Sequence, residues 1–168
     1  LSGVFSRDQR VVCLITPSDG IDEGEEVASE PLTIQNSPPE IISISLSPTD
    51  PELQTDDVLY ATVETSDADG EDVVLEYNWY INEVLADGVD GTAASLNGVE
   101  WFDEGDTIYV TVTPSDESGA GTSVTSETVR VGNSAPSVEG VTILPSDAVY
   151  GSTLECTWTV FDDPDGAG

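Results

Sequence analysis

Histidine, lysine and methionine are absent from this chain, and the only basic residues are Arg7, Arg10 and Arg130. Without histidine, neither Ser-His-Asp nor Cys-His catalysis is available, and metals that prefer nitrogen ligands lack their usual partner. Against these three arginines stand 34 aspartates and glutamates, which give a formal net charge of −31 at pH 7. Such a chain has no basic patch that could displace counterions from phosphates, so nucleic acid and anionic membranes are excluded as partners.

Long hydrophobic runs are also missing. No stretch of about 18 apolar residues occurs, so we expect no membrane-spanning segment. Apolar residues still make up 38% of the chain, many of them in short alternating runs, so the high charge does not imply disorder. Mutual repulsion of the carboxylates opposes compaction, and divalent cations should stabilise the fold. A saline, calcium-containing exterior is therefore the expected setting.

The sequence repeats itself with an offset of 97 residues. The motif TPSD occurs at residues 16–19 and again at 113–116, and 113 − 16 = 97. Residues 11–50, aligned with 108–147 without a gap, give thirteen identical pairs, and most other pairs exchange similar residues. We interpret this pattern as a tandem repeat.

Linkers that begin with Asn-Ser and contain proline, NSPPEI and NSAPSV, separate the repeats. Proline fixes φ and favours an extended preceding residue, so each linker should be short and stiff. The chain begins at Leu1 and stops within DPDGAG, a turn composition, so we expect both ends to be cuts through a longer polypeptide or to be completed by neighbouring subunits. The expected organisation is the C-terminal part of an upstream repeat at 1–35, a complete repeat at 36–132 and the N-terminal part of a downstream repeat at 133–168.

Apolar and polar residues alternate with a period of two through most of the complete repeat, in ISISLSP, VLYATVE, VVLEYNWYI, TIYVTVTP and SVTSETVRV. Turns rich in Asp and Gly separate these runs. About seven short strands in about 100 residues, without helical periodicity, predict an all-β fold built of immunoglobulin-like β-sandwiches. The residues expected to point inward are Ile42, Ile44, Leu46, Leu59, Ala61, Val63, Leu75, Tyr77, Trp79, Ile81, Ile108, Val110 and Val112.

An acidic loop, SDADGED at residues 66–72, is a candidate calcium site. Alternate residues of an extended stretch project on the same side, so Asp67 and Asp69 could share one cation, and Gly70 frees the backbone to turn. Asp72 could complete the shell of ligands. The alternative is that acidic turns only keep a salt-adapted protein solvated.

A second loop, DDPDG at residues 162–166, is equivalent to the first. Its Asp163 and Asp165 match Asp67 and Asp69, so it is a second candidate metal site. A calcium site between repeats also needs carboxylates near the linker, and Asp50 and Glu52 are close enough in sequence to contribute.

The order of NSPP, SDADGEDV, YNWYINEV, GDTIYVTVTPSD and SETVRVGNSAP resembles the tandem Ig-like, cadherin-like or PKD-like repeats of very large bacterial surface and secreted proteins. The resemblance covers the whole chain, although the WDFGDG type of signature of PKD domains is absent, since YINEV follows Trp79. It implies an extracellular stalk or fibre-forming spacer, with neighbouring repeats or subunits as partners. The alternative is an adhesin module that binds a carbohydrate or another surface ligand.

The two cysteines belong to different repeats. In the repeat register Cys13 corresponds to Val110, and Cys156 corresponds to Leu59 or Tyr60, depending on where a one-residue slip before DPDG is placed. A bond between them would have to reach past a whole repeat, far beyond the limit of about 7 Å between Cα atoms. The resemblance to immunoglobulin-type domains implies that each forms an intradomain disulfide with a partner outside this chain, in an oxidising compartment. The alternative is two free, buried thiols.

We expect no enzymatic activity, because the carboxylates lie in turns and glycoside hydrolysis needs one acid of raised pKa in a shaped cleft. The strand residues Trp79 and Trp158 are expected to pack in a core. Tyr80, Trp101 and Tyr109 are the candidates for an exposed platform on which a sugar could stack, although Phe102 beside Trp101 favours a local apolar cover there.

Overall fold

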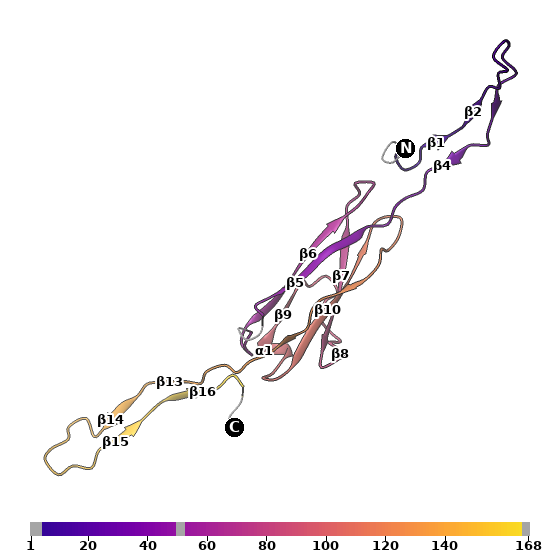
Figure 1. The fold of residues 1–168 in the computed structure, drawn as a ribbon. Coiled ribbons are helices and arrows are strands. Elements are labelled where there is room, and N and C mark those ends of the chain that lie inside the picture. The colour runs from indigo at the N-terminus through magenta and orange to yellow at the C-terminus, as the bar shows by residue number, and fades with distance from the viewer. Residues whose placement is uncertain (1–4, 50–52, 166–168) are drawn as a thin grey trace. The chain divides into compact units, whose positions relative to one another are not determined.

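The computed structural model describes residues 5–49 and 53–165. Its secondary structure consists of sixteen short strands and one helix of four residues, α1 at Gly98–Trp101 (Figure 1). The expected all-β class is therefore confirmed. Within the described ranges, no helix has the length and apolar character that a membrane span requires.

The chain divides into two compact bodies. The first body comprises Leu1–Ile42, Glu64–Leu75 and Thr113–Ser123, and the second comprises Ser43–Val63, Glu76–Val112 and Val124–Gly168. These boundaries cut through four strands of the central region and do not follow the repeat boundaries expected from the sequence.

Residues 40–130 contribute two sheets, whose strand orders are β5-β6-β9 and β11-β10-β7-β8, with β12 also paired to β10. The pairs β6–β9, β7–β8, β10–β11 and β10–β12 are antiparallel. The strands are β5 at Glu40–Ser47, β6 at Val58–Ser66, β7 at Val74–Ile81, β8 at Val84–Leu85, β9 at Ser95–Asn97, β10 at Thr107–Ser115, β11 at Val124–Thr125 and β12 at Val129–Arg130.

The core of the second body is built from both of these sheets. Leu59 and Leu96, of the three-stranded sheet, and Trp79, of the five-stranded sheet, are at most 1% exposed. Along β10 every second side chain is buried, as the alternating sequence predicts. The indole Nε1 of Trp79 donates a hydrogen bond to the carbonyl of Ala93 at 2.9 Å, so its one polar group is paired inside the core.

Two residues expected to be buried are exposed. Ile42 is 65% exposed, whereas Leu46, on the same face of β5, is 7% exposed, so burial fades toward the start of this strand. Trp158 is 60% exposed and lies between β15 (Glu155–Thr157) and β16 (Val160–Asp162), which belong to separate two-stranded sheets that no second layer covers within the described residues. Five further residues that were expected to point inward are only partly buried: Ile44, Val63, Leu75, Tyr77 and Ile81.

Two-stranded ladders flank the central sheets in sequence. In residues 10–33, β1 (Arg10–Val11) pairs with β4 (Leu32–Thr33), and β2 (Leu14–Ile15) pairs with β3 (Val27–Ala28). In residues 137–162, β13 (Ser137–Glu139) pairs with β16 (Val160–Asp162), and β14 (Thr142–Leu144) pairs with β15 (Glu155–Thr157). Cys13 and Cys156 are both free and exposed in the described residues.

The hydrogen bonds of residues 8–34 recur 97 residues later in the chain. Ser29 N–H donates to the Cys13 carbonyl at 2.9 Å, and Ser126 N–H donates to the Val110 carbonyl at 2.9 Å. The strand registers correspond in the same way, with Arg10↔Thr33 and Val11↔Leu32 matching Thr107↔Arg130 and Ile108↔Val129. The local sequence therefore builds the same ladder at both places.

One matched pair of substitutions separates buried from exposed strand residues. Leu46→Ala should lower the free energy of unfolding by about 2 kcal/mol or more, because it removes a buried side chain and leaves a cavity. Ile143→Ala, at the position 97 residues later, should change it by no more than about 0.5 kcal/mol because Ile143 is 61% exposed. Urea unfolding followed by tryptophan fluorescence measures both; equal effects would contradict the assignment of the core.

Candidate cation site

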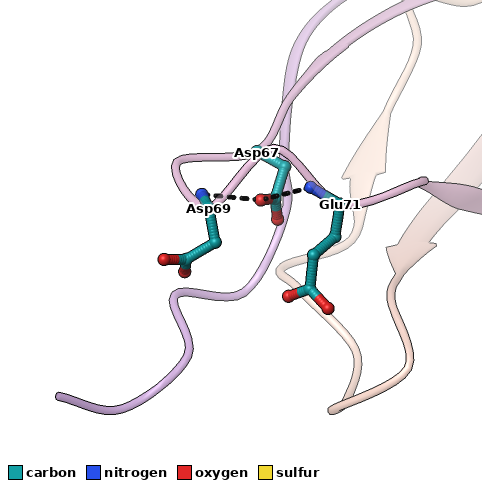
Figure 2. A group of neighbouring side chains, drawn as sticks. All are labelled: Asp67, Asp69 and Glu71. Atoms are coloured by element: carbon teal, nitrogen blue, oxygen red, sulfur yellow. Dashed lines mark hydrogen bonds between the residues drawn. The ribbon is translucent and has the colours of Figure 1, made fainter. Parts of the chain in front are cut away.

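Three carboxylates meet in the loop between β6 and β7. One carboxylate oxygen from each of Asp67, Asp69 and Glu71 lies within 4.8 Å of the other two (Figure 2). The three side chains are partly buried. Like charges this close repel one another, so the group favours a cation among its oxygens.

The loop folds around the carboxylate of Asp67. Its Oδ1 accepts hydrogen bonds from the backbone N–H of Asp69 at 2.8 Å and from that of Glu71 at 3.1 Å. Between them Gly70 has a φ of 77°, a conformation that costs glycine little and other residues more. Residues 67, 69 and 71 therefore bring their carboxylates together, as Figure 2 shows.

The same loop holds the linker that precedes β5. Ser37 N–H donates to Asp69 Oδ2 at 2.7 Å, a charge-assisted bond. The side-chain amide of Asn36 donates to Asp116 Oδ2 at 2.8 Å and to the Ser37 carbonyl at 3.2 Å. The linker is thus bonded to two separate turns, 66–71 and 116–119.

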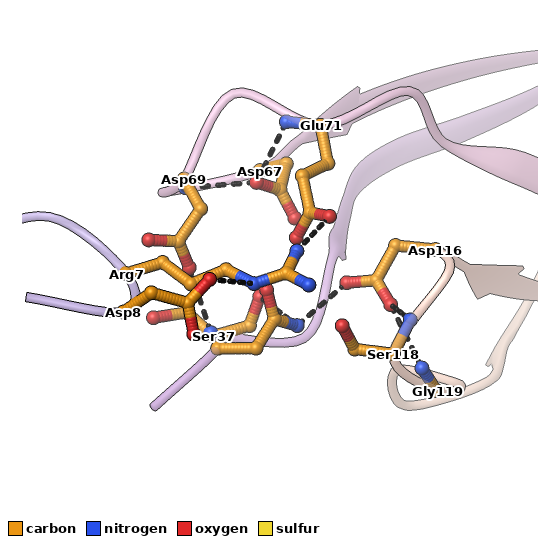
Figure 3. A network of polar contacts seen from close by, with 10 residues as sticks. Arg7, Asp8, Ser37, Asp67, Asp69, Glu71, Asp116, Ser118 and Gly119 are labelled. Carbon is orange, nitrogen blue, oxygen red and sulfur yellow. Dashed lines mark hydrogen bonds and ion pairs between the residues drawn. The ribbon is translucent and has the colours of Figure 1, made fainter. Parts of the chain in front are cut away.

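Arg7 is the one basic residue in the polar network that joins the 66–71 loop, the linker and the 116–119 turn (Figure 3). Its guanidinium Nη1 donates to Glu71 Oε1, and its Nε lies 3.6 Å from Asp8 Oδ2. The hydrogen bond to Glu71 is the main reason that the pKa of Arg7 is raised above its ordinary value. One guanidinium does not balance the three carboxylates of the loop, so the network retains excess negative charge.

Two carboxylate oxygens of the cluster are buried and lack a hydrogen-bond partner within the described residues: Asp67 Oδ2 and Glu71 Oε2. The side-chain oxygen of Asn36, in the adjoining linker, is in the same condition. Buried oxygens without donors are costly unless a donor or a cation serves them. An oxygen-only set of this kind suits a hard cation such as calcium and does not suit metals that prefer nitrogen or sulfur.

Of the three residues expected at this site, the structure brings Asp67 and Asp69 together and leaves Asp72 out. Asp72 is exposed, and Glu71 provides the third carboxylate. The alternation that selected Asp67 and Asp69 also selects residue 71, so the signal for Glu71 was present in the sequence. Arg7 had no such signal, because it lies 64 residues before Glu71.

The equivalent loop at residues 162–165 is arranged differently. Asp165 N–H donates to Asp163 Oδ1 at 3.3 Å, and Ser134 N–H donates to Asp165 Oδ2 at 2.7 Å, which repeats the bond between Ser37 and Asp69. The Thr55 hydroxyl, however, donates to Asp165 Oδ1 and shares a 2.7 Å hydrogen bond with the hydroxyl of Ser134. Thr55 and Ser134 are 3% and 2% exposed, so a buried hydroxyl and a buried backbone N–H serve this aspartate.

No group of three ligating side chains forms around Asp163 and Asp165 in the described part of the chain. The reason is visible in the sequence, because Ala167 stands where the first loop has Glu71. Asp50 and Glu52, the linker-side candidates, lie outside the described residues.

Two of the three aromatic residues considered for a sugar-stacking platform, Tyr80 and Tyr109, lie side by side. Tyr80 and Tyr109, on the neighbouring strands β7 and β10, stack with ring centroids 4.9 Å apart and an interplanar angle of 11°. Trp101 is partly exposed, and the adjacent Phe102 is 4% exposed, which agrees with a local apolar cover.

No protein-family model matches this chain, and a search of curated proteins gave no match. Its function must therefore be inferred from its own residues and their arrangement.

The bond between Asn36 and Asp116 can be tested by titration. The hydrogen bond from the Asn36 amide is the main cause that lowers the pKa of Asp116 below its ordinary 3.8. Partial burial raises this pKa, whereas the N–H groups of Ser118 and Gly119 and the charge of Arg7 lower it further. Folding lowers the pKa of Asp116, so the bond stabilises the fold at any pH above the ordinary pKa. This stabilisation is lost as the pH falls through the lowered pKa of the folded state.

Asn36→Ala should therefore raise the pKa of Asp116, as measured by carboxyl ¹³C NMR titration. Asp19, at the position 97 residues earlier, is an internal control, since the N–H groups of Asp22 and Ile21 lower its pKa without any part for Asn36. An unchanged pKa of Asp116, or an equal rise at Asp19, would show that the linker amide does not hold Asp116.

Proposed function

We propose that this chain is a structural repeat region of a long extracellular or cell-surface protein. In this proposal immunoglobulin-like sandwiches with a period of 97 residues follow one another as a stalk or fibre-forming spacer. The partners of each repeat are its neighbours in the same polypeptide or in an adjacent subunit. We assign no catalytic role, because the chain has no histidine and most of its carboxylates lie outside the strands.

The observation that carries this proposal is the bond between linker and loop. Ser37 N–H donates to Asp69 at 2.7 Å, and Ser134 N–H donates to Asp165 at 2.7 Å, so both Asn-Ser linkers are held by the same kind of loop. Each linker also contains a proline that limits its backbone. A linker bonded to a folded loop cannot swing freely, which is what a spacer requires of its joints.

Calcium is proposed as the cation that stiffens the first of these joints. The supporting features are the oxygen-only ligands of Asp67, Asp69 and Glu71, two buried oxygens without donors and the formal charge of −31. A cation bound to this loop would also hold Asp69 in place for its bond to Ser37. Calcium at millimolar concentration is a property of the extracellular setting that the composition favours.

Thermal unfolding of the full chain tests the calcium site. At fixed ionic strength, calcium should raise the midpoint relative to excess EDTA, by a stabilisation of about 2.7 kcal/mol when its concentration is 100 times the dissociation constant. Asp67→Asn with Asp69→Asn should abolish the rise. Glu76→Gln with Asp87→Asn is the matched control, because it removes the same charge from exposed positions outside the cluster.

A calcium effect that survives Asp67→Asn with Asp69→Asn, or that an equal ionic strength of sodium reproduces, would refute the site. The acidic loop would then be a solvated surface, and prolines and hydrogen bonds alone would stiffen the joint.

Arg7 should compete with calcium for Glu71, because its guanidinium already bonds to Oε1 of that carboxylate. Arg7→Gln should therefore lower the dissociation constant for calcium several-fold, as measured by isothermal titration calorimetry on the full chain. Arg10→Gln is the control, since it removes the same charge from an exposed side chain three residues away. Equal calcium affinities of the two variants would show that Arg7 does not occupy the cation position.

Ligand binding by an adhesin-like module is the second candidate function. It is favoured by the stacked rings of Tyr80 and Tyr109, since aromatic faces are the usual platform for sugars. It is the weaker candidate because these two rings stack against each other, which leaves at most one free face on each.

A further inference from the structure

We propose that the two flanking ladders, at residues 10–33 and 137–162, are docking surfaces for strands of their own repeat type. The occupant of the first surface is polypeptide equivalent to residues 36–97, and the occupant of the second is polypeptide equivalent to residues 73–132. The proposal rests on the repeat register and on burial, and it holds whether or not the array acts as a stalk.

The first ladder exposes side chains whose counterparts 97 residues later, in residues 107–130, are buried. Val112 is 0% exposed, whereas Ile15, 97 residues earlier, is 63% exposed; Val129 is 5% exposed, whereas Leu32 is 67% exposed. The hydrogen bonds and registers of the two ladders are the same. The difference is therefore not in how the ladder folds but in what covers it.

In the complete repeat, residues 36–97 provide that cover. They contribute β7, which lies beside β10, and the buried side chains of Leu59, Trp79 and Leu96. Asn82 N–H donates to the Thr107 carbonyl at 2.9 Å. Arg10 is the counterpart of Thr107, and its strand β1 pairs with β4 alone within the described residues, so the matching edge is open. An open edge beside an apolar face is a site for strand addition.

The second ladder has the same property on the other side of the repeat. Ile143 is 61% exposed, whereas Leu46, its counterpart, is 7% exposed. Cys156 is directly opposite Ile143 in the β14–β15 pair, so the two side chains share a face. This register assigns Cys156 to the place of Leu59, which is fully buried, and not to that of Tyr60, which is 56% exposed.

Neither ladder can bury these residues alone, because a two-stranded ladder has no second layer and is marginally stable in water. An anionic lipid surface is disfavoured by the charge of −31. Strands equivalent to those of residues 36–132 fit the exposed face, since the equivalent face is already buried within residues 36–132.

The two native cysteines report on the two faces separately. A full chain preceded by a second copy of residues 36–97 carries a complete repeat before the first linker, because Leu1 corresponds to Gly98. In this chain the alkylation of Cys13 by a maleimide should slow at least 100-fold, while Cys156 should react as before. A full chain followed by a copy of residues 73–132 should show the reverse. Neither copy contains cysteine, so no disulfide interferes.

Fluorescence of the added Trp79 copy in the first extended chain provides a second readout. It should match that of the resident Trp79, because residues 1–35 complete its core. An added segment that stays unfolded, or one that folds while Cys13 keeps its original rate, overturns the proposal. Protection of Cys13 in the unextended chain by phosphatidylcholine vesicles would also overturn it and assign the face to lipid.

Discussion

The structure depends on one constraint, that a strand with an apolar face must have that face covered. Residues 8–34 and 105–131 form the same hydrogen bonds at nearly the same lengths, yet only the second set lies in a core. Hydrogen bonding along a ladder is therefore a local property of this sequence, since the turn residues and the alternation determine it. Burial is not local, because the atoms that cover β10 come from strands distant in sequence, and the stability of each repeat must come mainly from them.

The two Asn-Ser linkers are subject to a second constraint, the repulsion within a chain of formal charge −31. Carboxylates are placed where they accept backbone N–H groups, as Asp69 does from Ser37 and Asp165 from Ser134. The acidic loops beside the two linkers differ in their partners. The first loop has Arg7 and a group of three carboxylates, and the second has the buried Thr55 hydroxyl, which is bonded to the Ser134 hydroxyl. If the proposed function holds, one array would combine cation-dependent and cation-independent joints.

Much of this arrangement could be predicted from sequence, and the failures have physical causes. The alternation predicted the strands and the buried faces of β6 and β10, and two aspartates at i and i+2 predicted the acidic cluster. Trp158 was placed in a core because alternation reveals which face is apolar, not whether another layer exists to cover it. Asp72 was expected to complete the shell of ligands, although the two-residue spacing leads from Asp69 to Glu71. Arg7 and Thr55 were missed because their partners lie 64 and 110 residues away, beyond any local pattern.

We propose that linkers bonded to acidic loops, together with calcium, hold successive repeats in a fixed arrangement. Spin labels on Cys13 and Cys156, the only cysteines and both exposed, allow the distance across both joints to be measured by pulsed electron spin resonance. We expect a single distance distribution that is narrow with calcium and broadens in EDTA. A distribution that is broad in both conditions and unaffected by calcium would contradict it, since the joints would then be flexible whatever the carboxylates bind.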